Sequence, residues 1–280
     1  MAPVVVGATP DADDAVAWAL GYAGGHGAPV RLVRAYEPGD LWPGGVACAL
    51  GVPRAGLRDV LARATLTRAR RLVRAAGRPT DEEPSIDVVE GRPVDALLAA
   101  ARGASMVVVG HRPRPAEAVW GFGSVALGVL RHAPTTVTVV RSAAPDGAVV
   151  VGMDGTSTAR CALRHGLADG AVRGVRTVVV LAGTAVVPAW LHRQVEEAAR
   201  ALRDAGTEPG PVDVVAVEGP PGRALLVVAA RQHTSVLVVG HRERGRTAVM
   251  MHGSVGQELV AKAPLPVTLV APDPAVGEHR

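Results

Sequence analysis

One short pattern occurs twice in the chain, 130 residues apart (240 − 110), and restricts the fold more than any other feature. A run of valines ends at Gly110, and a second run ends at Gly240. After 13 residues (123 − 110 and 253 − 240), a Gly-Ser-Val segment opens an apolar-periodic stretch in each copy; its residues are Gly123, Ser124 and Val125, then Gly253, Ser254 and Val255. Valine runs that end at glycine predict buried parallel strands, and the serines predict helix N-caps. The chain therefore contains two copies of one strand–loop–helix design.

The rest of the sequence extends this pattern to two complete domains. The first half alternates five valine-rich strands with four helices, and the order restarts after a Pro-Asp-Gly linker. A repeat of this length indicates duplicated domains and not a solenoid. We expect an α/β fold in which each domain holds a five-stranded parallel sheet with helices on both faces. The predicted limits are 1–141 and 148–271, with a linker at 142–147 and a frayed tail at 272–280.

Composition supports large cores and argues against several classes of protein. Of the 280 residues 48% are hydrophobic, but the aromatic residues are only four Trp, two Tyr and one Phe, so valine, leucine and alanine must fill the cores. The formal charge of +4 comes from arginines interleaved with acids, with no nucleic-acid motif beside them. The two cysteines, Cys48 and Cys161, lie far apart in the sequence, without the short spacing of a zinc site. A chain with so few cysteines fits a reducing compartment. We expect a cytoplasmic protein that binds neither nucleic acid nor membrane.

The loops after Gly110 and Gly240 are candidates for binding phosphate. Each would lie between the carboxyl end of a strand and the N-terminus of a helix, where free N–H groups and the helix dipole favour an anion. Arg112, Arg114 and Arg242 lie in these loops, and arginine suits phosphate geometry. The same arginines could instead be ordinary solvated residues. Asp154 follows the first strand of the second half and could be a ligand or simply end that strand in a turn.

These features together resemble the universal stress protein family in both halves. The resemblance rests on the Gly-x(12)-Gly-Ser pattern, on Asp154 after Gly152, and on the proline-led fifth strands. It implies a Rossmann-like fold of the adenine nucleotide alpha hydrolase type. It also implies, for one subgroup, ATP binding through Gly-x2-Gly-x9-Gly-Ser/Thr, with Mg²⁺ as a possible companion. The cofactor-binding candidates are Gly152, Asp154, Gly240, Arg242, Gly253, Ser254 and Val255, and in the first half Gly110, Gly123, Ser124 and Val125.

Both halves depart from the family pattern. The middle glycine of the loop is Pro113 in the first half, and proline has no N–H to offer a phosphate. It is Glu243 in the second half, whose carboxylate would repel a triphosphate unless Mg²⁺ lay between them. Thr9 stands where the family has its aspartate, whereas the second half keeps Asp154. The second half is therefore the better candidate for a nucleotide.

No catalytic template occurs in the sequence, and we predict neither catalytic residues nor a dedicated metal site. The predicted function is that of a non-enzymatic tandem stress-response regulator that binds ATP or a related adenine nucleotide. The alternatives are a nucleotide-independent interaction module whose sites have decayed, and a slow ATPase. The resemblance also implies pairing of the fifth strands, 135–140 and 266–270, in a pseudo-dimer, and a homodimer of the chain is a further hypothesis.

Overall fold

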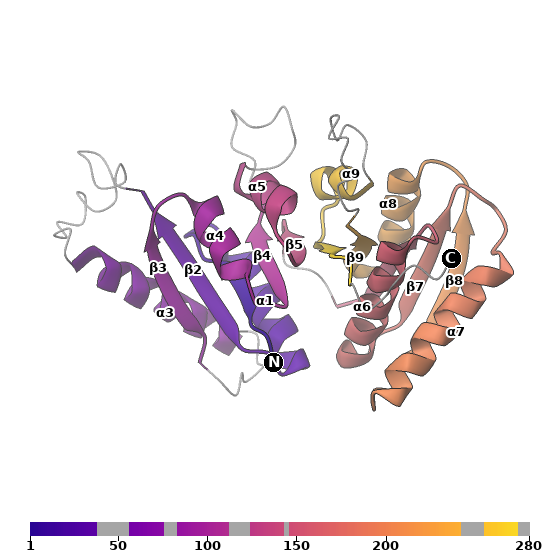
Figure 1. Cartoon of the computed structure of the whole chain (residues 1–280), viewed down its shortest axis with the longest axis horizontal. Helices are drawn as coiled ribbons and strands as arrows, with labels where there is room; N and C mark the ends of the chain where they lie inside the picture. The colour runs from indigo at the N-terminus through magenta and orange to yellow at the C-terminus, as the bar shows by residue number, and fades with distance from the viewer. Residues whose placement is uncertain (38–55, 76–82, 112–123, 143–145, 242–254, 274–280) are drawn as a thin grey trace. The chain divides into compact units, whose positions relative to one another are not determined.

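The computed structural model describes residues 1–37, 56–75, 83–111, 124–142, 146–241 and 255–273 (Figure 1). The chain divides into two compact units, Met1–Ala143 and Ala144–Arg280. We retain 1–141 and 148–271 as the proposed domain limits within these units. Among the described residues, no helix is both long and apolar enough to cross a membrane.

The first unit alternates strands and helices along its length. Its elements are β1 (Val4–Gly7), α1 (Asp13–His26), β2 (Val30–Tyr36), α3 (Leu57–Ala75), β3 (Ser85–Glu90), α4 (Pro93–Ala101), β4 (Met106–Gly110), α5 (Ser124–His132) and β5 (Thr136–Val140). The strands lie in the order β3-β2-β1-β4-β5, and every neighbouring pair is parallel. This is the doubly wound arrangement that the valine runs predict.

The second unit repeats this arrangement. Its elements are β6 (Ala148–Met153), α6 (Ser157–Arg173), β7 (Thr177–Ala182), α7 (Ala189–Asp204), β8 (Val212–Val217), α8 (Pro221–Arg231), β9 (Thr234–Gly240), α9 (Val255–Lys262) and β10 (Val267–Val270). The strand order is β10-β9-β6-β7-β8, again with parallel neighbours. The predicted fold class, two repeated Rossmann-like domains, is confirmed.

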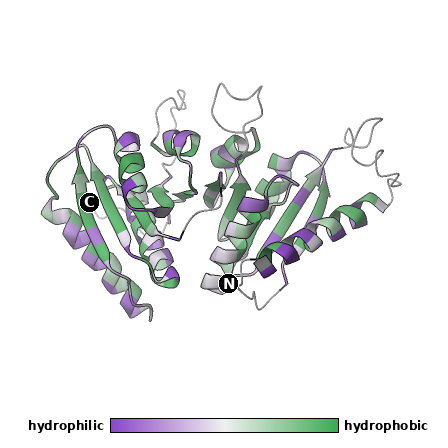
Figure 2. Ribbon diagram, turned by 180° about the vertical axis from the view of Figure 1, so that it is seen from behind, coloured by the Kyte–Doolittle hydropathy of each residue, from purple (hydrophilic) through white to green (hydrophobic). Residues whose placement is uncertain are grey.

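Helices cover both faces of each sheet. In the first unit α1 and α3 pack on one face and α4 and α5 on the other; in the second, α6 and α7 pack opposite α8 and α9. The central strands are fully buried, with Val5, Val107 and Val150 showing no exposed surface. Figure 2 shows the strands predominantly hydrophobic, with polar residues on the outer sides of the helices. Each sheet thus forms the centre of a three-layer core built largely from valine.

A glycine turns the chain after β8. The strand ends at Val217, and Gly219 has a φ of 107°, which glycine adopts without strain. The helices that follow the two candidate loops are described from Ser124 in α5 and from Val255 in α9.

The contact between the two helices on the second face is built differently in the two units. In the first unit, Val94 near the start of α4 packs on Gly128 of α5; an added Cβ at Gly128 would lie 2.8 Å from Val94 Cγ2. The equivalent residues in the second unit are Gly222 of α8 and Glu258 of α9, and a Cβ at Gly222 would overlap the Glu258 carboxylate. Each unit therefore pairs one glycine with one larger residue. The glycine is on the second helix of the pair in the first unit (α5) and on the first helix of the pair in the second unit (α8).

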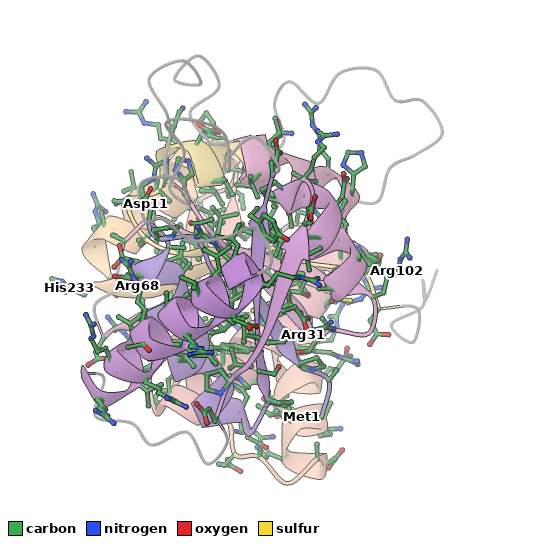
Figure 3. All side chains as sticks on the ribbon, turned by 90° about the vertical axis from the view of Figure 1, so that its left-hand side faces the viewer. Met1, Asp11, Arg31, Arg68, Arg102 and His233 are labelled. Atoms are coloured by element: carbon green, nitrogen blue, oxygen red, sulfur yellow. The ribbon has the colours of Figure 1, made fainter. Side chains whose placement is uncertain are left out.

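A second difference lies in the turn before the fourth strand. Gly103 lies two residues after the end of α4 in the first unit and has a φ of 84°, which glycine adopts without strain. The equivalent residue is His233, whose φ is 48°. This histidine is exposed at the surface and is labelled in Figure 3. A left-handed conformation costs a non-glycine residue roughly 1–2 kcal/mol, so this turn is less stable in the second unit.

Candidate functional site

The strand order places a topological switch point beside the first strand of each unit. From β6 the chain winds outward through β7 and β8, then crosses back to β9 on the other side of β6. The same reversal occurs between β1 and β4. In open α/β sheets, ligands bind at the carboxyl ends of the strands at such a point. The candidate sites are therefore the loops that follow β6 and β9, and those that follow β1 and β4.

In the second unit, Asp154 follows β6 and organises the loop that leads into α6. Its Oδ1 accepts hydrogen bonds from the Thr156 N–H at 3.0 Å and from the Thr156 hydroxyl at 2.6 Å. The Thr156 Oγ1 in turn accepts the Ala159 N–H at 3.2 Å and so caps α6. Asp154 is exposed, so its carboxylate lies at the surface of the switch point while it holds this turn. The turn and ligand readings of Asp154 are compatible.

Gly240 allows the end of β9 to approach the start of α6. A Cβ at this position would lie 2.6 Å from the carbonyl carbon of Thr158 and 2.8 Å from the Ala159 nitrogen. Gly152 in β6 is less crowded, with the nearest side chains, Leu225 and Val239, at 3.0 Å. Glycine at 240 therefore has a packing role in the helix–strand contact that does not depend on any phosphate.

Trp190, in the first turn of α7, lies over the same loop. The Cη2 and Cζ3 atoms of its indole are 3.6 and 3.8 Å from the Cβ position of Gly155. Gly155 has a φ of 81°, so glycine is needed here for the turn geometry, whereas a Cβ would make only ordinary contact with the ring. The indole remains partly exposed. An aromatic ring and a carboxylate therefore flank one short loop at the carboxyl end of β6.

The equivalent place in the first unit has different chemistry. Thr9 follows β1, and the N-terminus of α1 at Ala12 has no side-chain cap. Arg34 of β2 reaches this loop, and its Nη1 donates to the Ala8 carbonyl at 3.2 Å. A Cβ at Gly110 would lie 3.5 Å from the Ala12 Cβ, an ordinary contact. This loop thus has an arginine against its backbone and no carboxylate at the position of Asp154.

The histidines that follow the two glycines continue the sheet hydrogen bonding at the carboxyl ends of β4 and β9. The His111 N–H donates to the Val140 carbonyl at 2.7 Å, and the His241 N–H donates to Val270 at 2.8 Å. These two N–H groups are therefore engaged by the neighbouring strands. His111 is 4% exposed, and its Nε2 lies 3.0 Å from an Nη2 of Arg141. Burial lowers the pKa of Arg141, and a neutral imidazole is the form that accepts its N–H.

Acidic residues lie beside the N-terminus of α1. Arg68 of α3 forms an ion pair with Asp13, and the hydrogen bond to Asp13, with a smaller contribution from Asp11, raises the Arg68 pKa. Figure 3 labels Asp11 and Arg68, which come from different elements of this unit. The pair is largely exposed, so its contribution to stability is within about 1 kcal/mol. The charges near this loop are thus mixed and do not form a dedicated anion site.

The structure describes only part of the predicted binding set. Gly152, Asp154 and Gly240 lie together at the switch point between β6 and β9, and Val255 begins α9. In the first unit, Gly110 ends β4, and α5 contains Ser124 and Val125. The other residues of the two candidate phosphate loops lie outside the described ranges; they are Arg112, Pro113, Arg114, Gly123, Arg242, Glu243, Gly253 and Ser254. Within those ranges, no group of three or more His, Cys, Asp or Glu is arranged to hold a metal.

Comparison with known proteins establishes the family. The model of the universal stress protein family matches residues 3–141 and again residues 147–271. The chain belongs to the universal stress protein family. A universal stress protein of Mycolicibacterium smegmatis is 30% identical over 289 residues, which covers 96% of each chain. One from Mycobacterium tuberculosis is 30% identical over 308 residues, covering 98% of this chain and 96% of its own.

A solved structure supports the fold. The crystal structure of a universal stress protein from Archaeoglobus fulgidus DSM 4304 matches 96% of this chain and 98% of its own length, with a TM-score of 0.69 and 16% identity. At this identity the likeness shows the fold alone. The tandem arrangement predicted from the 130-residue repeat is thus confirmed at the level of family and fold.

Trp190 is not among the binding residues predicted from the sequence. A signal for its position was present, because it begins a helix that follows a predicted strand, and all such helices in a parallel sheet begin at the carboxyl edge. What the sequence lacked was the position of the indole beside Gly155, the residue that follows Asp154 in this universal stress protein fold.

Proposed function

We propose that this universal stress protein binds ATP or a related adenine nucleotide in its second unit, and that it acts through binding and not through turnover. The observation that carries the proposal is that Asp154 and Gly240 lie at the carboxyl ends of the paired strands β6 and β9, at the switch point. The family pattern supplies the second support, since Gly240, Gly253 and Ser254 keep its glycine and serine positions. The first unit, with Thr9 and Pro113, is the weaker candidate.

The described residues fit a nucleotide in their donor and acceptor chemistry. The exposed Asp154 carboxylate offers acceptors for hydroxyl or amino groups, while the start of α9 at Val255 offers the positive end of a helix dipole to phosphate. Mg²⁺, when bound, would neutralise phosphate charge, and it commonly takes one or two carboxylates beside phosphate oxygens. Among the described residues at this switch point, Asp154 is the carboxylate that would hold Mg²⁺.

The test is a titration of the purified chain with matched variants. Protein is first denatured and any released nucleotide identified by mass spectrometry, and ATP is then titrated by calorimetry with and without Mg²⁺. Asp154→Asn keeps an acceptor for Thr156 and removes only the charge. Weaker ATP binding by this variant would show that the negative charge of Asp154 contributes to binding. Thr9→Ala, at the equivalent position in the first unit, is the control that should leave binding unchanged.

Binding should also appear as stabilisation of the fold. A ligand present at 100 times its Kd stabilises the native state by about 2.7 kcal/mol. ATP should therefore raise the melting temperature of the wild type and of Thr9→Ala, but raise that of Asp154→Asn less. No released nucleotide, no heat and no thermal shift would refute the proposal and favour a nucleotide-independent interaction module. Phosphate release lost in Gly253→Trp would favour a slow ATPase.

A further inference from the structure

We propose that the indole of Trp190 packs against the base of the bound nucleotide and makes the second unit selective for a base-containing ligand over a bare polyphosphate. This inference rests on the proposed function and adds a specificity-determining residue to the site. It starts from the contact between Trp190 and Gly155, one residue from Asp154.

The geometry leaves part of the indole available. One edge of the six-membered ring faces Gly155: Cη2, Cζ3 and Cζ2 lie 3.6 to 4.0 Å from where a Cβ on Gly155 would stand. The residue is neither fully buried nor fully exposed. A partly exposed indole offers apolar surface on which a base can stack, and every nucleobase has a π-face.

The segment that leads to Trp190 is apolar at the surface. Val186, in the connection between β7 and α7, is 71% exposed, and of the large hydrophobic side chains that the structure describes only Met1 is more exposed. Its backbone is held by Thr184, whose Oγ1 accepts the Val186 N–H at 3.2 Å and donates to the Val186 carbonyl at 3.3 Å. The exposed Val186 and the partly exposed Trp190 at the start of α7 provide apolar surface that an aromatic base would cover.

The carboxylate and the indole belong to the same unit. Asp154 follows β6, and Trp190 lies in the first turn of α7. In the first unit, Thr9 stands at the position of Asp154. The stacking proposal therefore concerns the second unit.

The experiment compares two ligands on three proteins. ATP and inorganic tripolyphosphate, each with Mg²⁺, are titrated into the wild type, Trp190→Phe and Trp190→Leu. Loss of base stacking should weaken ATP binding by Trp190→Leu about tenfold, with Trp190→Phe intermediate, and leave tripolyphosphate binding unchanged. A role confined to holding the loop would weaken both ligands equally.

Tryptophan fluorescence provides a second readout, with Trp18→Phe as the matched control. ATP should quench tryptophan emission, and this quenching should be lost in Trp190→Phe but retained in Trp18→Phe, a change at a buried tryptophan of the first unit. ATP binding that is insensitive to Trp190→Leu, or quenching that survives in Trp190→Phe, would overturn this inference alone. A wild type that binds no ATP would refute the proposed function as well.

Discussion

Alanine at Gly240 and at Gly110 tests how differently the two units use the same glycine. Neither glycine has a positive φ, so alanine is acceptable to the backbone at both positions and only the surroundings differ. At Gly240 the new Cβ would lie 2.6 and 2.7 Å from the carbonyl carbon and oxygen of Thr158. At Gly110 the nearest atom would be the Ala12 Cβ at 3.5 Å.

The expected energies follow from these contacts. Separations below 3 Å from backbone atoms require α6 or the end of β9 to move by several tenths of an ångström, and overpacking of this kind costs about 1–3 kcal/mol. At Gly110 no movement is needed, and replacement of glycine by alanine at a compatible site is neutral or stabilises by about 0.4–1 kcal/mol through the unfolded chain. Gly240→Ala should therefore lower the stability of the second unit, and Gly110→Ala should leave the first unchanged or slightly improved.

Calorimetric melting of the two variants and the wild type provides the assay. A change of 1 kcal/mol shifts the melting temperature of a domain of this size by several degrees. Because Thr158 is met through its backbone, Thr158→Ala should not rescue Gly240→Ala. Equal losses at the two glycines, or rescue by Thr158→Ala, would show that the close approach of β9 to α6 does not determine the outcome.

Three further comparisons use the differences between the units. Thr156→Ala should cost about 0.5–2 kcal/mol by removing the cap of α6, whereas Thr156→Ser keeps the hydroxyl and should cost little; equal losses in urea denaturation would contradict the cap. Gly128→Ala should destabilise the wild type but stabilise a Val94→Ala background by up to about 1 kcal/mol, and a double-mutant cycle without coupling would contradict the contact. His233→Gly should raise the melting temperature, because glycine at Gly103 shows the residue that this turn prefers; a lower value would indicate a contact that the histidine makes.

The fold was accessible from the sequence because its signals are local and occur twice. The fold class follows from the valine runs, the turns after them and the constant offset between the halves, without any tertiary information. The site was less accessible. The sequence suggested two readings of Asp154, and only the hydrogen bonds to Thr156 show how one carboxylate serves the turn while remaining exposed. The crowding at Gly240 and the placement of Trp190 depend on contacts across the fold.

The nucleotide, the pairing of the fifth strands and a homodimer stay predictions. Light scattering that shows a strict monomer would count against the homodimer.

The reversed placement of glycine between Val94–Gly128 and Gly222–Glu258 has a consequence for recombination between the two halves of the gene. A crossover that falls between the two helices would give one hybrid unit valine opposite glutamate and the other glycine opposite glycine. The first hybrid has no space for both side chains, and the second leaves a void. Exchange is tolerable only when both helices move together as one block. Duplicated halves that began as copies have thereby become non-interchangeable in their parts, and a functional chimaera must place its junction outside residues 94–128.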